Sequence, residues 1–374
     1  MREIVAELAG WRADGVRFAI ATVVSTWRSA PRPPGAAMAV SETGEVIGSV
    51  SGGCVEAAVY ELARTVLATG VAVTETYGVS DGDAFAVGLT CGGIIDVLVQ
   101  PGDDLPDQVL SGVRDGRPIA IASMLDAGDG LGRRLVVPAD DGVDRVVTDG
   151  SVPDGFDRVA ADGCGPDGFD RVVAGQAAGM LAAGATGVVA LGARGRRVFV
   201  QSFAPPPRML VYGAIDFAGA VARIGAFLGY RVTVCDARPV FATRRRFPDA
   251  DEVVVRWPHE HLATADVDAR TVICVLTHDP KFDVPLLVRA LRSPAGYVGA
   301  MGSRATHEDR LRRLREAGVP ESSLARLASP IGLDLGARTP EETAVSIAAE
   351  IIASAQGGSG RRLTDLHTPI HHGA

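Results

Sequence analysis

The chain has 374 residues, of which 47% are hydrophobic, and it carries a formal net charge of −8. This length exceeds what one compact core usually accommodates and predicts two domains. The acidic balance argues against a nucleic-acid surface, which needs a basic stripe. We find no apolar segment that suits a signal peptide or a membrane span. Five cysteines without a C-x-x-C pair predict reduced thiols in a cytoplasmic protein and offer no zinc pattern.

The first part of the chain reads as an α+β domain over residues 1–203. One helix is predicted, at 54–69, and the segment 30–35, which is rich in proline and glycine, separates the first two strands. The predicted strands cover residues 17–24, 36–40, 45–50, 71–76, 93–99, 117–125, 133–137 and 186–191.

A repeated unit interrupts this domain. Residues 141–147, 154–160 and 167–173 are one Asp-Gly-rich motif written three times with a period of 13, and Cys164 lies within it. Glycine and aspartate are turn formers, so we expect a duplicated surface hairpin inserted at about 139–173, and we assign it no function.

A second domain follows the proline run 205–207 and is predicted over 204–356. Strands at 209–212, 231–235, 271–276 and 296–300 alternate with helices after the first strand, at 280–292, at 304–317 and at 340–355. This alternation predicts a Rossmann-like, doubly wound parallel sheet. The arginine runs 244–246 and 310–313 are interpreted as solvated helix faces, and 357–374 as a flexible tail.

Cys54 is the most informative residue of the sequence. It closes the turn Ser51-Gly52-Gly53-Cys54 and stands where the predicted helix opens, and a second turn, Cys91-Gly92-Gly93, follows 37 positions later. Glycines let successive N–H groups converge, and a helix start adds positive charge, so such turns favour thiolates and anions. The alternative is that both cysteines are small core residues. The pair of turns favours a binding site.

The turn after the first strand of the second domain resembles a dinucleotide fingerprint with a defect. Gly213 and Ala218 fill the outer positions of G-x-G-x-x-G/A, and Asp236 follows 23 residues after Gly213. Ile215 replaces the middle glycine and Asp216 adds a negative charge, both unfavourable for a pyrophosphate. The fold is therefore predicted more firmly than NAD(P) binding. Asp236 is either a ribose ligand or a loop cap.

Two further segments stand at the predicted carboxyl ends of strands, where such sheets bind ligands. His278 and Asp279 follow the third strand and suit either a site or turn and cap chemistry. Ser303 and Arg304 open the helix after the fourth strand and offer a hydroxyl and a cationic fork. Thr339 is predicted to cap the last helix, with Pro340 at its first position.

Five segments together resemble the XdhC/CoxI family, whose members are accessory proteins of xanthine dehydrogenase and carbon monoxide dehydrogenase. They run in order through both domains, at 31–36 (PRPPGA), 48–56 (GSVSGGCVE), 88–93 (GLTCGG), 297–304 (YVGAMGSR) and 330–349. Many relatives have G-A-G-H-V-A where this chain has residues 213–218, a departure that puts a family contact with nucleotide or pterin phosphate at this turn in doubt. The chain also lacks the cysteine clusters of iron–sulfur enzymes.

The resemblance implies a carrier of molybdenum cofactor, a pterin with a metal-binding dithiolene and a terminal phosphate. Cys54 and Cys91 would contact the molybdenum centre, because a thiolate is a soft ligand. Gly52, Gly53, Gly92 and Gly93 would line the same pocket. Arg32 would face the phosphate, and Gly213, Asp236, Ser303 and Arg304 would complete the cofactor site. The implied partners are a molybdenum hydroxylase apoenzyme, a sulfurtransferase and a second copy of the chain.

Two other functions stay open. An NAD(P)-dependent oxidoreductase would use the second domain, against the obstruction at Ile215. A non-catalytic scaffold would dock a partner dehydrogenase without needing its cysteines for ligand retention. The carrier ranks first, the scaffold second and the oxidoreductase third. The fold alone does not decide among the three functions.

Overall fold

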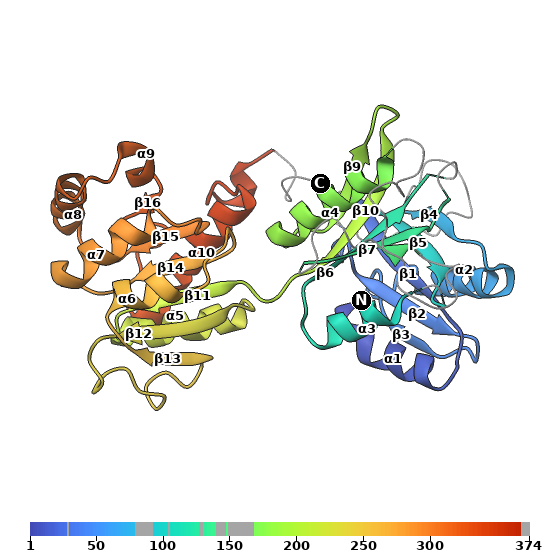
Figure 1. Cartoon of the computed structure of the whole chain (residues 1–374), viewed down its shortest axis with the longest axis horizontal. Coiled ribbons are helices and arrows are strands. Elements are labelled where there is room, and N and C mark those ends of the chain that lie inside the picture. The colour runs from blue at the N-terminus through green and yellow to red at the C-terminus, as the bar shows by residue number, and fades with distance from the viewer. Residues whose placement is uncertain are drawn as a thin grey trace. The chain divides into compact units, whose positions relative to one another are not determined.

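The computed structural model describes residues 1–27, 30–78, 93–103, 105–126, 130–139, 147–148 and 168–367. These residues divide into two compact units, an N-terminal unit that ends at Pro205 and a C-terminal unit that begins at Pro206 (Figure 1). Most of the triple repeat, including Cys164, lies outside the described residues, as do Cys91 and Gly92.

Two antiparallel sheets form the N-terminal unit. Within the described residues, one has the strand order β3-β2-β1-β5-β4 and the other the order β8-β7-β6-β10-β9. The strands of the first sheet are β1 (Phe18–Trp27), β2 (Ala37–Ser41), β3 (Val46–Gly48), β4 (Val73–Tyr77) and β5 (Ile94–Pro101). Those of the second are β6 (Ile119–Met124), β7 (Arg134–Pro138), β8 (Val147–Thr148), β9 (Gly187–Leu191) and β10 (Arg196–Phe203).

Alternating side chains give each sheet two buried faces. On β1, Phe18 and Ile20 enter a core shared with the second sheet, whereas Ala19 and Ala21 pack beneath the helix α2 (Glu56–Thr69). The second sheet faces the shared core with Ile121 and packs its other side against α4 (Phe169–Ala183). The remaining helices border the shared core: η1 (Arg2–Ile4), α1 (Val5–Ala13) and α3 (Asp107–Arg114).

The structure of the third copy of the repeat contradicts the predicted hairpin at its end. Phe169–Ala183 is helical, so the last residues of that copy open α4 instead of returning as a strand. Phe169, Val173, Ala177 and Leu181 recur every fourth residue and are all buried, which is a helical and not a hairpin spacing. Asp170 of this copy pairs with Arg133, at 2.6 Å.

The C-terminal unit is the predicted doubly wound parallel sheet. Its order is β13-β12-β11-β14-β15-β16, and every described neighbour pair is parallel. The strands are β11 (Arg208–Tyr212), β12 (Arg231–Asp236), β13 (Glu252–Val255), β14 (Val272–Val275), β15 (Tyr297–Ala300) and β16 (Leu327–Ala328). The α/β fold class predicted from the sequence is therefore confirmed.

Helices cover both faces of this sheet (Figure 1). One face packs against α5 (Asp216–Phe227) and α10 (Pro340–Gln356), with Val211 and Ile347 in its core. The other face packs against α6 (Pro258–Thr264), α7 (Pro280–Ala290), α8 (Arg304–Glu316) and α9 (Glu321–Leu324), and η4 (Leu363–Asp365) follows α10. Thr339 caps α10 with Pro340 in the first turn, as predicted. Across the described residues we find no helix with the length and apolarity that crossing a membrane requires.

Candidate functional site

The loop before α2 carries Cys54 and is held by an acidic side chain of its own. Helix α2 begins at Glu56, two residues later than predicted, with Val55 at its N-cap. The N–H groups of Gly52 and Gly53 donate to the Glu56 carboxylate at 3.0 and 2.8 Å. The sequence predicted that these glycine amides would converge on an anion. They do, and the anion in this structure is Glu56.

These contacts set the charge state of Glu56. Burial alone would raise the pKa of this carboxyl, but hydrogen bonds from Ser49, Ser51 and backbone N–H groups outweigh it and hold the pKa at about 2. Glu56 is therefore ionised at neutral pH, and the loop encloses a fixed negative charge next to Cys54.

Residues 52 and 53 are glycines because the backbone there adopts positive φ angles, and not because a side chain would lack space. Their φ angles are +82° and +122°, and a Cβ at either position would meet no atom within 4 Å. Both glycines are exposed, so the surface above them is open to a ligand. The positive φ turns their N–H groups toward Glu56.

Cys54 is half-buried and packs at the margin of the core beneath α2. That core includes Tyr77 and Ile95, a cross-strand pair of β4 and β5. Gly93 is buried directly before β5. The chain between β4 and β5 contains Cys91 and Gly92, which lie outside the described residues, so the proximity of the two cysteines stays a prediction.

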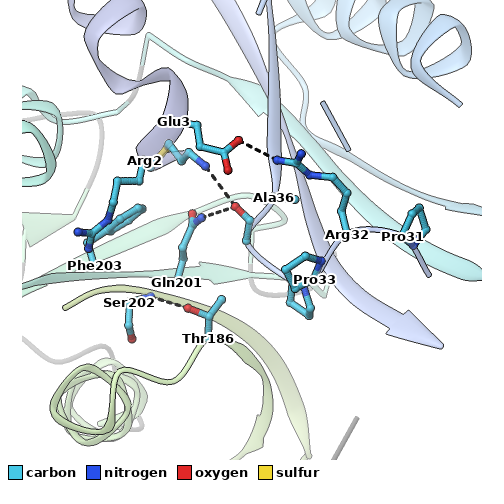
Figure 2. A pocket seen from close by; sticks show the side chains of 13 residues that line it. Arg2, Glu3, Pro31, Arg32, Pro33, Ala36, Thr186, Gln201, Ser202 and Phe203 are labelled. Carbon is cyan, nitrogen blue, oxygen red and sulfur yellow. Dashed lines mark hydrogen bonds and ion pairs between the residues drawn. The ribbon is translucent and has the colours of Figure 1, made fainter. Parts of the chain in front are cut away.

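Arg32 lines a polar pocket of about 400 Å³ in the N-terminal unit (Figure 2). Arg2 and Gln201 share its wall, and the pocket lies where the loop before β2 meets β10. Arg32 Nη2 is 2.8 Å from Glu3 Oε2, and Arg2 Nη2 donates to Ala204 O at 2.7 Å. Gln201 Nε2 donates to Gly35 O at 2.9 Å and so ties this loop to the second sheet. The residues that line the pocket thus carry two guanidinium groups, each engaged by a protein acceptor, and the role of Arg32 toward a phosphate stays a prediction.

The dinucleotide-like turn of the C-terminal unit is filled by protein groups. Ala214 N donates to Asp236 Oδ2 at 2.8 Å, and Arg238 grips the same carboxylate with Nε and Nη2 at 2.9 and 2.8 Å. Burial raises the pKa of Asp236, but the hydrogen bonds from Arg238 and Ala214 prevail and hold it below its usual range. Asp236 therefore has the geometry of the loop cap considered from the sequence.

Gly213 and Asp216 complete that turn. A Cβ at Gly213, where φ is +110°, would lie 2.9 Å from Thr277 N, so this glycine permits close packing against the end of β14. Asp216 opens α5 and pairs with Arg246 at 3.0 Å, which places a carboxylate where a phosphate would rest. Ile215 stands at the N-cap of α5.

Ser303 and Arg304 lie at the start of α8, as predicted. Ser303 Oγ caps the helix by accepting from Thr306 N at 3.1 Å, and both residues are exposed. Asp279 likewise caps α7 by accepting from Lys281 N at 3.1 Å, whereas His278 is exposed. For Asp279 the cap interpretation is the one that the geometry supports.

Sequence analysis was wrong about one arginine of the 310–313 run. Arg310 is 3% exposed, and its Nη2 contacts Asp283 Oδ2 at 3.1 Å and donates to Met301 O at 2.7 Å. Thr277 donates to the other oxygen of Asp283, and Arg310 Nη1 donates to Ser329 Oγ at 2.8 Å. This buried network joins the carboxyl ends of three strands, β14, β15 and β16. Its sequence signal was the spacing of Arg310 from Leu314 on the inward face of α8.

Across the described ranges, histidine, cysteine, aspartate and glutamate nowhere gather in threes as a metal site would require.

Comparison with known proteins shows which family has this architecture. Residues 11–78 match the family described as "XdhC and CoxI family", and residues 209–351 match its companion, the "XdhC Rossmann domain". The chain therefore belongs to the XdhC and CoxI family, as the sequence motifs predicted.

Two curated relatives extend over nearly the whole chain. A probable xanthine dehydrogenase subunit of Bacillus subtilis is 27% identical and covers 91% of this chain and 93% of its own length. The "molybdenum cofactor insertion chaperone PaoD" of Escherichia coli is 26% identical over 90% of this chain and 83% of its own length. A crystal structure described as a xanthine dehydrogenase of Bacillus halodurans shares the fold, with a TM-score of 0.63, 24% identity and 98% coverage of both chains.

Proposed function

We propose that this chain is an accessory protein that binds molybdenum cofactor and delivers it to a molybdenum hydroxylase of the xanthine dehydrogenase or carbon monoxide dehydrogenase type. The observation that carries the proposal is the similarity to the insertion chaperone PaoD over 90% of the chain. The same similarity supports a molybdenum enzyme as the partner, and we propose that the carrier acts in the cytoplasm.

The residues of the N-terminal unit suit this cargo in their chemistry. Cys54 offers a soft sulfur ligand beside an open surface, which matches molybdenum and its terminal sulfur. Arg32 and Arg2 offer guanidinium groups for a terminal phosphate, and a pocket of about 400 Å³ falls in the size range of small-molecule sites. We assign Cys54 and Cys91 to the metal end, with Gly52, Gly53, Gly92 and Gly93 around them, and Arg32 to the phosphate end.

Contributions of Gly213, Asp236, Ser303 and Arg304 to the cofactor site remain part of the proposal. Of these, Ser303 and Arg304 are exposed at the carboxyl edge of the parallel sheet and accessible to an anionic group. Asp236 is occupied by Arg238 and Ala214, so we propose that its part is to shape the turn. We further propose that the chain works as a homodimer and meets a sulfurtransferase when its cargo is sulfurated.

Delivery of the cofactor is tested by measuring its transfer to an apoenzyme. Protein purified anaerobically with its cargo is mixed with a molybdenum hydroxylase apoenzyme, and the substrate turnover of that enzyme is followed. Appearance of turnover with loaded protein, and none with protein stripped of cargo, supports the proposal. Equal turnover from free cofactor alone at the same concentration, with no protection by the protein, contradicts it.

The oxidoreductase alternative requires nicotinamide binding by the C-terminal unit. The Ala214 N–H that a pyrophosphate would use is engaged by Asp236, and Ile215 and Asp216 stand at the helix start. Fluorescence titration with NADPH separates this alternative from a carrier, because only the oxidoreductase needs saturable binding. A scaffold function would instead leave cargo retention independent of Cys54.

A further inference from the structure

Both oxygens of the Glu56 carboxylate are saturated by donors from the loop that carries Cys54. Oε1 accepts from Ser49 Oγ at 2.6 Å and from the N–H groups of Val50, Ser51 and Gly52 at 3.3, 2.9 and 3.0 Å. Oε2 accepts from Ser51 Oγ at 2.5 Å and from the N–H groups of Gly53 and Val55 at 2.8 and 3.2 Å. One side chain thus fixes the backbone of consecutive residues on both sides of Gly52.

Cys54 is attached to this carboxylate through one intermediary. Its N–H donates to Ser51 Oγ at 3.0 Å, and Ser51 Oγ in turn donates to Glu56 Oε2. Val55 N also donates to Ser51 Oγ, at 3.1 Å. The main chain on both sides of the Cys54 thiol therefore depends on the ionised carboxylate.

We propose that Glu56 is the positioning residue that holds the Cys54 loop in its binding conformation. This inference rests on the proposed function, because the conformation that matters is the one in which Cys54 contacts the molybdenum centre. Glu56 itself touches no cargo. It acts by keeping the glycine-rich loop ordered while the surface above Gly52 and Gly53 stays open.

A carboxylate is the group that this loop requires. Glutamine has the same shape, but its amide nitrogen is a donor and would face the N–H groups of Gly53 and Val55, which are donors too. The charge also strengthens each contact, since hydrogen bonds to an ionised acceptor are about twice as strong as neutral ones. Glu56→Gln should therefore loosen the loop without changing the volume of the side chain. Glu61→Gln is the matched control, because Glu61 is an exposed glutamate on the same helix.

The first measurement is hydrogen exchange at pH 7, resolved to peptides, together with the rate of Cys54 alkylation by iodoacetamide. In Glu56→Gln we expect exchange in residues 50–55 to accelerate by about tenfold or more and the Cys54 alkylation rate to rise, while α2 and both sheets of the N-terminal unit keep their protection. Glu61→Gln should match the wild type. Unchanged exchange in Glu56→Gln would overturn the proposal.

The second measurement ties the loop to the cargo. Molybdenum content after anaerobic purification is compared in Glu56→Gln, Cys54→Ser and the double variant. If Glu56 acts through Cys54, each single variant loses molybdenum and the double variant loses no more than Cys54→Ser. Full retention in Glu56→Gln with loss in Cys54→Ser overturns the positioning role. An unloaded wild type contradicts the proposed function instead, and the exchange data then decide the loop inference alone.

Discussion

Arg32 Nη2 and Glu3 Oε2 lie 2.8 Å apart in the wall of the polar pocket, so the arginine assigned to the cargo phosphate already holds a carboxylate (Figure 2). The Glu3 side chain is 73% exposed and the Arg32 side chain 31% exposed. An incoming anion must therefore displace an exposed acid from a cation that is mostly shielded. Glu3 therefore competes with an incoming anion for the Arg32 guanidinium, and substitution of Glu3 removes this competition.

Glu3→Gln should strengthen anion binding in this pocket. An exposed ion pair is worth about 0.2–1 kcal/mol, so removing the competing carboxylate is expected to tighten binding of a phosphorylated pterin by about 1.4- to fivefold. Arg32→Gln should weaken it. Equilibrium dialysis measures both, with Glu7→Gln on α1 as the control for net charge. Weaker binding in Glu3→Gln would show that Glu3 helps to hold the ligand.

The buried pair of Arg310 and Asp283 should dominate the stability of the C-terminal unit. Burial raises the pKa of Asp283, while its contacts with Thr277 and Arg310 lower it, so removal of the guanidinium leaves a costly buried acid. Arg310→Met is expected to lower the free energy of unfolding by about 3–5 kcal/mol in urea titration.

Arg312→Met provides the contrast to Arg310→Met. Arg312 belongs to the same arginine run, but it is exposed and pairs with Asp309 and Glu316 on the helix surface. Its substitution should change the free energy of unfolding by no more than about 0.5 kcal/mol. Equal effects at the two positions would argue against the buried network.

The order of the Cys54 loop should depend on acid pH. The pKa of Glu56 lies at about 2 in the folded chain against an ordinary value of 4.5. A lowered folded pKa contributes stability that is complete above pH 4.5 and is lost as the pH falls toward 2. The rate at which a dipyridyl disulfide modifies Cys54, divided at each pH by its rate with an unstructured cysteine peptide, should therefore rise from about pH 5 downward, before the sheets unfold. In Glu56→Gln this normalised rate should be high and independent of pH over the same range.

Glycine-to-alanine substitutions should lower stability in one part of the N-terminal unit and raise it in another. Gly52→Ala and Gly53→Ala place a side chain at positive φ, and each should cost about 1 kcal/mol of loop stability despite the open space around it. Gly175→Ala, in the interior of α4 with no atom within 4 Å of a new Cβ, should stabilise by about 0.5–1 kcal/mol. Thermal unfolding and loop-resolved hydrogen exchange distinguish the two outcomes.

The parallel sheet could be predicted from the sequence because its strands are short apolar runs, such as residues 271–276, between amphipathic helices. Helix α4 was missed because the Asp-Gly motif at its start is turn chemistry, although Phe169, Val173 and Leu181 keep a helical spacing. In the prediction for this segment, the turn-forming composition was given more weight than the helical spacing of the apolar residues.

The candidate site was predictable only in part. Cys54 and its glycines follow from motif chemistry, and Arg32 follows from the family resemblance. The anion that fills the glycine turn, however, is a side chain from the next helix. A single sequence does not reveal that Glu56 folds back onto the loop that precedes it. Arg310 was misread for a different reason: the run of charges favoured a solvated face, although the four-residue spacing of Arg310 from Leu314 placed it on the inward face of α8.

Molybdenum and pterin, measured in protein purified anaerobically from a host that makes the cofactor, show whether the chain carries the cofactor through its cysteines. Wild type, Cys54→Ser, Cys91→Ser and Cys235→Ser are compared; Cys235 is buried and its thiol donates to Arg256 O, a role that serine can keep. We expect one cofactor per chain in the wild type and in Cys235→Ser, and loss of the cofactor in Cys54→Ser and Cys91→Ser. Equal retention in all four proteins, or none in the wild type, would contradict it.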